Sequence, residues 1–288
     1  MKKNKGISSI VAVLIILIVG LGAVFVIQKS TDLDYFTNSN LKFFSEENSE
    51  EKSVPDNNKE PKKKEDNKTP TYKVAIIIDD VGNNYETDKK LSQINQNLTL
   101  AVLPNRGATL QSVKYLSSFN NFQFLLHLPL EPIKEKDVEE DMIMTSMERG
   151  EIKNKIDGYL KELGQYIVGV NNHKGSKFTS DHNAMKILLE ELNAENLFFV
   201  DSFTYKDSIA YQVAKEINIK TAKRDIFLDN SDNKEEIRKK VNETVELAQQ
   251  KGEAIAIGHS KPNTITVLEE ELKNYNNIEF VKVSQLLQ

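Results

Sequence analysis

The sequence predicts an α/β fold built on a mostly parallel sheet. From residue 72 onward, short apolar segments alternate with longer amphipathic ones, which is the pattern of strands joined by crossover helices. The first apolar segment, 74–78, is an uninterrupted run of Val, Ala and Ile, as expected of a parallel strand covered on both faces. Several predicted strands also run directly into polar residues. In open and barrel α/β folds the functional groups lie at these carboxyl ends.

The N-terminal segment, before this domain, is predicted to anchor the chain in a membrane. Lysines among residues 1–6 precede an uncharged run of 21 residues, 7–27, which at about 1.5 Å per residue spans a hydrocarbon core of about 30 Å. No small-residue cleavage site follows, so we expect an uncleaved signal anchor. The positive-inside rule places residues 1–6 in the cytoplasm and the rest of the chain outside it. Cleavage would instead give a secreted protein.

Residues 28–71 are predicted to form a flexible charged linker. The stretch 45–71 is dense in Glu, Lys, Asn, Asp and Pro and offers little apolar surface to bury. Such a composition cannot offset the entropy lost on ordering. We therefore expect a tether between the membrane and a folded domain at 72–288.

Within this domain the apolar pattern predicts seven strands and six helices. Ser180, Ser208 and Asn263 resemble helix starts, because each places a capping side chain before a helical period. The predicted strands are 74–78, 98–102, 122–126, 167–170, 197–200, 254–257 and 279–283, and the helices are 108–118, 152–163, 181–193, 208–216, 234–250 and 264–272.

Composition excludes several kinds of site and partner. The chain has no cysteine, so neither a disulfide nor a thiolate metal site can form, and a metal would need His, Asp, Glu or Asn. The net charge of -5 is modest, and no basic patch laced with aromatic residues stands out. Nucleic acid is therefore not an expected partner.

Polar residues follow five of the predicted strands. Because the carboxyl ends of neighbouring parallel strands meet on one rim, three of the four histidines and several acids should converge there. This convergence predicts a metal site or an acid/base site. The fourth histidine, His182, is expected to be exposed or to cap a helix. The polar groups at the strand ends are Asp79-Asp80, His127, Asn171-Asn172-His173, Asp201-Ser202 and His259.

Six ordered motifs resemble those of the divergent polysaccharide deacetylases, the YibQ-like branch of the NodB-homology carbohydrate esterases. The resemblance implies a distorted (β/α) barrel of about seven strands with a metal site at its carboxyl rim. It also implies metal-dependent hydrolysis of N-acetyl groups on a cell-envelope polysaccharide, with Zn²⁺ as the expected divalent metal. The motifs are IDDVG at 78–82, LLHLPLEP at 125–132, GVNNHKGSKFT at 169–179, FFVDSFT at 198–204, RDIFLDN at 224–230 and AIAIGHSKPNTI at 254–265.

The same resemblance implies a first set of roles. Asp79 matches the general base and Asp80 a metal ligand. His127 and Glu131 keep the spacing of the family's two histidine ligands, with a carboxylate in the second place.

Further roles concern the third ligand, the acid and the substrate. His173 is the alternative third ligand. His259 matches the general acid, and Asp201 is a candidate to orient it. The family's Arg-x-Pro-Tyr segment is replaced here by Asn-Asn-His-Lys-Gly-Ser. We expect the substrate to be contacted by Asn172, Ser176, Arg224 and Asp229.

Two other functions compete with a deacetylase. The domain could keep the fold and bind a glycan or a partner protein without turning it over. It could also hydrolyse glycosides with two carboxylates such as Asp79 and Asp201, which needs no metal. Metal dependence separates the deacetylase from the glycosidase, and turnover separates it from the binding domain.

Overall fold

The computed structural model describes residues 72–288. The predicted anchor at 7–27 and linker at 28–71 lie outside these residues, so both stay predictions. In the described part of the chain, no helix combines the length and apolar character needed to cross a bilayer.

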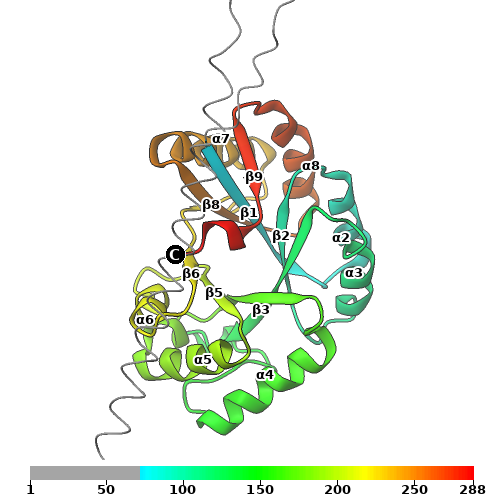
Figure 1. The fold of residues 1–288 in the computed structure, drawn as a ribbon. Helices are drawn as coiled ribbons and strands as arrows, with labels where there is room; N and C mark the ends of the chain where they lie inside the picture. The colour runs from blue at the N-terminus through cyan, green and yellow to red at the C-terminus, as the bar shows by residue number, and fades with distance from the viewer. Residues whose placement is uncertain (1–71) are drawn as a thin grey trace, which may run out of the picture. The chain divides into compact units, whose positions relative to one another are not determined.

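The described residues form one curled, fully parallel sheet with helices along its outer side (Figure 1). The strand order is β6-β5-β4-β3-β2-β1-β8-β7, with β9 paired to β1. The parallel α/β prediction is therefore confirmed as a curled half-barrel. The strands are β1 (Tyr72–Val81), β2 (Leu98–Val102), β3 (Phe122–Leu130), β4 (Ile167–Lys174), β5 (Phe198–Asp201), β6 (Thr221–Lys223), β7 (Ile226–Phe227), β8 (Glu253–His259) and β9 (Ile278–Val281).

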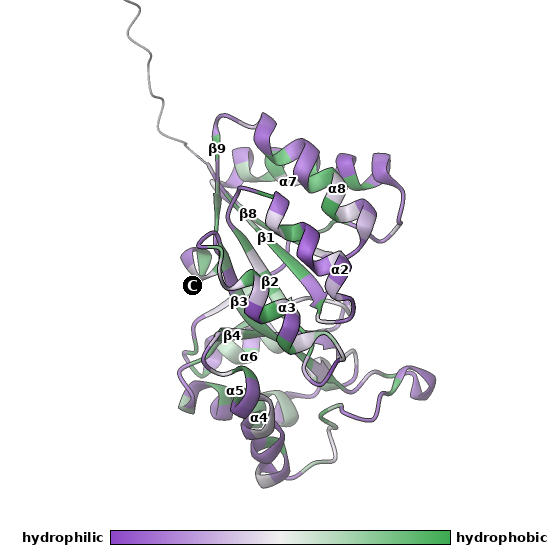
Figure 2. Ribbon diagram, turned by 90° about the vertical axis from the view of Figure 1, so that its right-hand side faces the viewer, coloured by the Kyte–Doolittle hydropathy of each residue, from purple (hydrophilic) through white to green (hydrophobic). Residues whose placement is uncertain are grey.

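Seven α-helices are described, joined by loops that include short 3₁₀ turns. Figure 2 shows that the strands are mostly hydrophobic, whereas the helices are mainly hydrophilic with hydrophobic positions among them. This is the distribution expected when each helix packs one apolar stripe on a buried sheet. The helices are α2 (Tyr85–Asp88), α3 (Thr109–Leu116), α4 (Arg149–Leu163), α5 (His182–Ala194), α6 (Ala210–Glu216), α7 (Lys234–Lys251) and α8 (Pro262–Glu271).

The connection between β6 and β7 curls the sheet. β6 pairs with β5, whereas β7 pairs with β8 at the other end of the strand order. The two residues between them hydrogen bond to strands at opposite ends of the sheet. The Arg224 N–H donates to the Asp201 carbonyl of β5, and the Asp225 N–H donates to the Ile255 carbonyl of β8. One short stretch of chain thus joins both ends of the sheet. These two strands were missing from the prediction because three- and two-residue segments carry no periodic signal.

Other predicted boundaries also differ. β1 and β3 continue past residues 78 and 126, so Asp79, Asp80 and His127 lie within strands instead of after them. Helix α5 is capped by Asp181, whose side chain accepts from the Ala184 N–H, and not by Ser180. The predicted caps at Ser208 and Asn263 are also wrong, because Ile209 occupies the cap of α6 and Lys261 that of α8. In α8, Pro262 takes the first helical turn, where proline is favoured.

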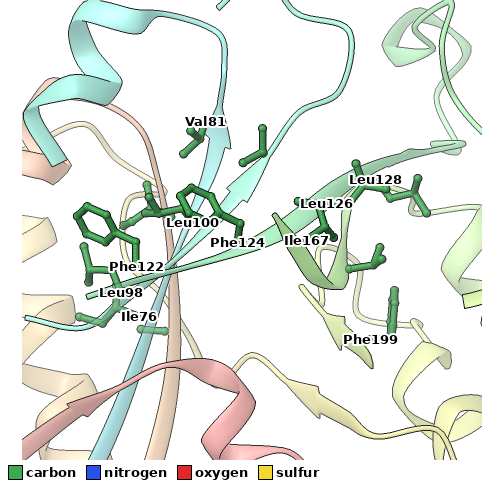
Figure 3. Close-up of a cluster of buried hydrophobic side chains, with 14 of the residues drawn as sticks. Ile76, Val81, Leu98, Leu100, Phe122, Phe124, Leu126, Leu128, Ile167 and Phe199 are labelled. Atoms are coloured by element: carbon green, nitrogen blue, oxygen red, sulfur yellow. The ribbon is translucent and has the colours of Figure 1, made fainter. Parts of the chain in front are cut away.

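The two faces of the sheet bury separate hydrophobic clusters. Ile76, Leu100 and Phe124 belong to the larger cluster, which also contains helix residues and therefore lies on the outer, helix-covered face (Figure 3). Ile77 and Leu125 belong to a second cluster, formed by strand residues and the C-terminal segment, inside the curl. Because side chains alternate along a strand, each position can be assigned to one face.

Candidate metal centre

Strand alternation places most of the predicted site on the inner face. Asp79 continues the inward row of Ala75 and Ile77 on β1. On β8, His259 continues the inward row and pairs in register with Asp79. On β3, His127 follows Leu125 by two residues and pairs with Asn171 of β4. His173 lies two residues beyond Asn171, on the same face.

The side chain of Asp80 also lies at the inner face, but strand alternation does not place it there. Alternation would turn its side chain to the outer face, but its φ is 64° and the pairing of β1 with β2 shifts register between Ile78 and Val81. A left-handed backbone is uncommon for a residue other than glycine. As a result, Asp80 Oδ1 lies 3.4 Å from His127 Nε2 and 3.3 Å from His173 Nδ1.

Asp80, His127 and His173 form a group that fits a divalent cation. One ligand atom from each lies within 4.8 Å of the others. Asp80 Oδ1 is buried and has no hydrogen-bond partner among the described residues, an arrangement that is costly unless another group satisfies the oxygen. Two imidazole nitrogens and one carboxylate oxygen are also a ligand set that catalytic zinc accepts.

Asn171 links this group to Asp79. Its side-chain oxygen lies 2.9 Å from His127 Nδ1, and its side-chain N–H donates to Asp79 Oδ1 at 2.8 Å. Asn171 is fully buried and also donates to the Ser202 hydroxyl. Asn171 had no predicted role, although its spacing of two from His173 already placed both residues on one face of the strand.

Glu139 is a second contact that the sequence did not indicate. It lies in the loop between β3 and α4, and its Oε1 is 3.4 Å from His173 Nε2 and 2.7 Å from Lys174 Nζ. Arg106 donates to the other oxygen. Burial favours the neutral acid, but the hydrogen bonds from Lys174, Arg106 and His173 lower the pKa of Glu139 to about 2. No strand or helix pattern marks this loop, so only the fold brings Glu139 here.

The buried carboxylates and His127 shift one another's proton affinities. Burial raises the pKa of Asp79, against the effect of the nearby His127 and His259. Burial also opposes protonation of His127, but the charge of Asp79 and the nearby carboxylate of Asp80 raise the pKa of His127 to about 9. The pKa of Asp80 is lowered, because the two histidine rings close to Oδ1 favour the carboxylate and outweigh its burial. Without a cation, the group therefore holds a proton on His127 at neutral pH.

Asp229 is the carboxylate that contacts His259. Asp229 Oδ1 lies 2.9 Å from His259 Nδ1, and Oδ2 accepts from the His259 backbone N–H and the Thr264 hydroxyl. Asp229 is 1% exposed. Burial opposes protonation of His259, but the hydrogen bond and charge of Asp229 raise its pKa. Asp229 was predicted to contact the substrate, whereas its carboxylate is directed to His259.

Asp201 lies on the opposite face of the sheet, which corrects the expectation that it orients His259. Phe198 and Val200 of β5 face inward, so Asp201 faces the helices. Its carboxylate accepts from the Phe203 N–H at 2.8 Å and the Ser208 hydroxyl at 2.9 Å. Asp201 therefore shapes the loop that follows β5.

Glu131 is also engaged away from the candidate ligands. Its Oε2 accepts from both the N–H and the hydroxyl of Thr145 at 2.7 Å, and its Oε1 accepts from Lys177 at 2.7 Å. The group of mutually close ligand atoms contains His173 and not Glu131. Of the two alternatives for the third ligand, the geometry favours His173.

A cleft of about 470 Å³ opens beside these residues. Of the predicted substrate contacts, Asn172 and Ser176 line it, while their side chains also hydrogen bond to neighbouring loops. Arg224 does not line the cleft, because its guanidinium donates to the Ser202 and Phe203 carbonyls. The other lining residues are Asp79, His127, Pro132, Asp137, His173, Lys174, Thr204, Phe227 and His259.

Comparisons with known proteins identify related sequences. A family model described as divergent polysaccharide deacetylase matches residues 76–287. The uncharacterised protein YibQ of Escherichia coli K12 is 33% identical over 216 residues, covering 75% of this chain and 67% of that protein. An uncharacterised protein of Haemophilus influenzae is 31% identical over 202 residues, covering 70% of this chain and 71% of that protein.

Solved structures share the fold at lower identity. The crystal structure of an uncharacterised protein from Agrobacterium tumefaciens C58 matches with a TM-score of 0.69 at 19% identity, covering 76% of this chain and 90% of that one. A putative cellobiose-phosphate cleavage protein of Enterococcus faecalis V583 matches with a TM-score of 0.54 at 14% identity, covering 76% of this chain and all of that one.

Proposed function

Because this chain belongs to the divergent polysaccharide deacetylase family, we propose that it hydrolyses N-acetyl groups on a cell-envelope polysaccharide with the help of a divalent metal. The observation that carries the proposal is the conformation of Asp80. Its left-handed backbone turns a carboxylate toward His127 and His173 and leaves Oδ1 buried without a hydrogen-bond partner among the described residues. Such strain is typical of functional sites.

Asp80, His127 and His173 are the proposed ligands, and Zn²⁺ is the expected metal because it accepts both histidine nitrogen and carboxylate oxygen. Such a cation, when bound, would polarise an amide carbonyl and lower the pKa of a neighbouring water. The ligands come from β1, β3 and β4, with β2 between the first two, so the sheet itself sets their positions.

Asp79 is the proposed general base. It lies beside the proposed ligand Asp80 but does not belong to the group of close ligand atoms, so it remains available to accept a proton. Its raised pKa, caused by burial, makes it a stronger base than an exposed aspartate. The hydrogen bond from Asn171 orients one carboxylate oxygen, Oδ1, and the other lies 3.7 Å from His127 Nε2.

His259 is the proposed general acid toward the departing amine. Its Nδ1 is held by Asp229, which leaves Nε2 as the nitrogen available to donate a proton in the cleft that His259 lines. The buried carboxylate raises the pKa of His259 and so favours the protonated form that this role requires. Asn172 and Ser176 line the same cleft and stay the proposed substrate contacts.

The proposed location is outside the cytoplasm, on a membrane anchor at 7–27. This part of the proposal depends on the sequence pattern of the N-terminal segment alone. It suits a polysaccharide of the cell envelope as the substrate.

Metal content and acetate release together test the proposal. Elemental analysis of the purified protein should find bound metal, and acetate release from acetylated amino-sugar oligomers should stop when a chelator is added. Asp80→Ala and His127→Ala should both lose the metal and the activity. Glu131→Gln should keep the metal, because Glu131 is bonded to Thr145 and Lys177 instead.

Other outcomes would favour the competing functions. Stoichiometric metal without acetate release from any acetylated glycan would favour a domain that binds a glycan or a partner protein. Chelator-insensitive cleavage of glycosidic bonds would favour a glycosidase. Wild-type metal content in both ligand variants would refute the ligand assignment.

A further inference from the structure

We propose that Glu139 is a positioning residue that holds His173 in the tautomer and orientation needed for metal binding. This inference depends on the proposed metal site and adds a residue that neither strand position nor motif indicated. The starting observation is that the carboxylate of Glu139 lies against the ring nitrogen of His173 that faces away from Asp80.

Both candidate ligand histidines are held in the same way. His127 directs Nε2 toward Asp80 and its Nδ1 toward the side-chain oxygen of Asn171, at 2.9 Å. His173 directs Nδ1 toward Asp80 and its Nε2 toward Glu139 Oε1, at 3.4 Å. In each case the second ring nitrogen meets an oxygen acceptor, which is the arrangement that metal-binding histidines almost always have.

Two basic side chains fix the position of the Glu139 carboxylate. Its Oε1 accepts from Lys174 Nζ at 2.7 Å, and its Oε2 accepts from Arg106. Lys174 Nζ also donates to the Asp137 carbonyl at 3.0 Å, in the same loop as Glu139. The loop between β3 and α4 is thus attached to the end of β4 immediately next to His173.

The backbone of Lys174 is arranged for this contact. Lys174 has a φ of 54°, which is uncommon for a residue with a long side chain. Its carbonyl accepts from the Asn172 side chain at 2.9 Å and from the Thr204 hydroxyl at 2.7 Å. These bonds stabilise the turn that places Lys174 Nζ beside Glu139.

The Glu139 carboxylate affects how His173 can bind a cation. When a cation binds at Nδ1, the ring keeps one proton on Nε2, and the carboxylate of Glu139 is placed to accept that proton in a hydrogen bond. A negatively charged acceptor at Nε2 also increases the electron density on Nδ1, so the imidazole binds a cation more strongly through Nδ1. Removal of such a partner typically weakens metal binding about 10–100-fold.

The test is the affinity of Co²⁺ for the purified wild type and variants, measured by calorimetry. Glu139→Ala should bind Co²⁺ about 10–100-fold more weakly. Glu139→Gln, which keeps an oxygen acceptor but lacks the charge, should lie between Glu139→Ala and the wild type. Glu140→Ala is the matched control: Glu140 is exposed and adjacent in the same loop, so this variant removes one charge without touching His173 and should bind as the wild type does.

A second variant separates positioning from loop structure. Glu131→Gln weakens the attachment of the same loop to Thr145 and Lys177 without removing Glu139. Nitrogen NMR of the Zn²⁺-bound protein adds a readout that does not involve affinity: the Nε2–H proton of His173 should be protected from exchange with water in the wild type and should exchange faster in Glu139→Ala.

The outcomes distinguish this inference from the proposed function. Unchanged Co²⁺ affinity in Glu139→Ala would overturn the inference and leave the metal site intact. Equal weakening in Glu131→Gln or Glu140→Ala would also overturn it, because loop order or overall charge would then explain the effect. Failure of the wild type to bind any divalent metal would overturn the proposed function and the inference together.

Discussion

Metal binding should displace the proton that His127 carries. The metal-free protein holds the pKa of His127 at about 9, so at pH 7 about 100 molecules carry the proton for each one that does not. A metal needs the deprotonated nitrogen, and its apparent affinity at pH 7 is therefore lowered about 100-fold, or about 3 kcal/mol. The affinity should rise about tenfold per pH unit as the pH increases from 6 toward 8.

Two measurements check this prediction. Nitrogen NMR of the metal-free protein should show the His127 ring still doubly protonated at pH 8, with both nitrogens donating. Calorimetry in buffers of different protonation enthalpy should show release of about one proton per metal ion at pH 6, below the pKa of about 7 that zinc-bound water reaches. A neutral His127 ring at pH 7 would refute the reasoning.

Asp79 provides a control for the same prediction. Its charge is the largest of the effects that raise the pKa of His127, ahead of the nearby carboxylate of Asp80. Asp79→Asn should therefore bring the pKa of His127 closer to its ordinary value of about 6.5. Metal affinity should then depend less on pH above pH 7, because less protonated His127 remains to compete with the metal. An unchanged titration of His127 in this variant would show that Asp79 is not the source of the shift.

Three further outcomes are expected. Asp79→Asn should keep the metal but lower turnover about 10²–10⁴-fold, measured as acetate release, because the general base is lost; near wild-type turnover would exclude that role. Asp229→Asn should lower the pKa of His259, so the alkaline limb of the pH–rate profile should move to lower pH; an unmoved limb would show that another group supplies the proton. Gly169→Ala should lower the free energy of unfolding by about 1–3 kcal/mol in denaturant titrations, because the new Cβ would lie 2.5 Å from the Phe198 ring; unchanged stability would mean that the ring moves freely.

The strand ends were predictable because their signal is local. An uninterrupted Val-Ala-Ile run followed by acids locates both a buried parallel strand and its functional end, as in 74–80. The order of such segments also predicted parallel α/β architecture, and the resemblance of six motifs pointed to the family that the comparisons show. The short strands β6 and β7 escaped prediction because they contain too few residues for any period.

The roles within the site were harder to predict, for a physical reason. A strand buried on both faces is apolar at every position, so its sequence does not tell which residues face the interior of the curl. Asp201 was therefore indistinguishable from an inward residue, and only the structure places it on the helix side. Asp80 is the reverse case, because a local left-handed backbone overrides alternation and brings it to the histidines.

The sequence by itself determined the fold class, the family and the strand ends at which the candidate site residues lie, since each depends on neighbours along the chain. The tertiary structure alone decided which side chains meet. It brought Asp229 to His259, Asn171 to both His127 and Asp79, and Glu139 to His173. These partners are separated by about 30 to 90 positions in the chain, and only the curling of the sheet and the seating of its loops bring them within hydrogen-bonding distance.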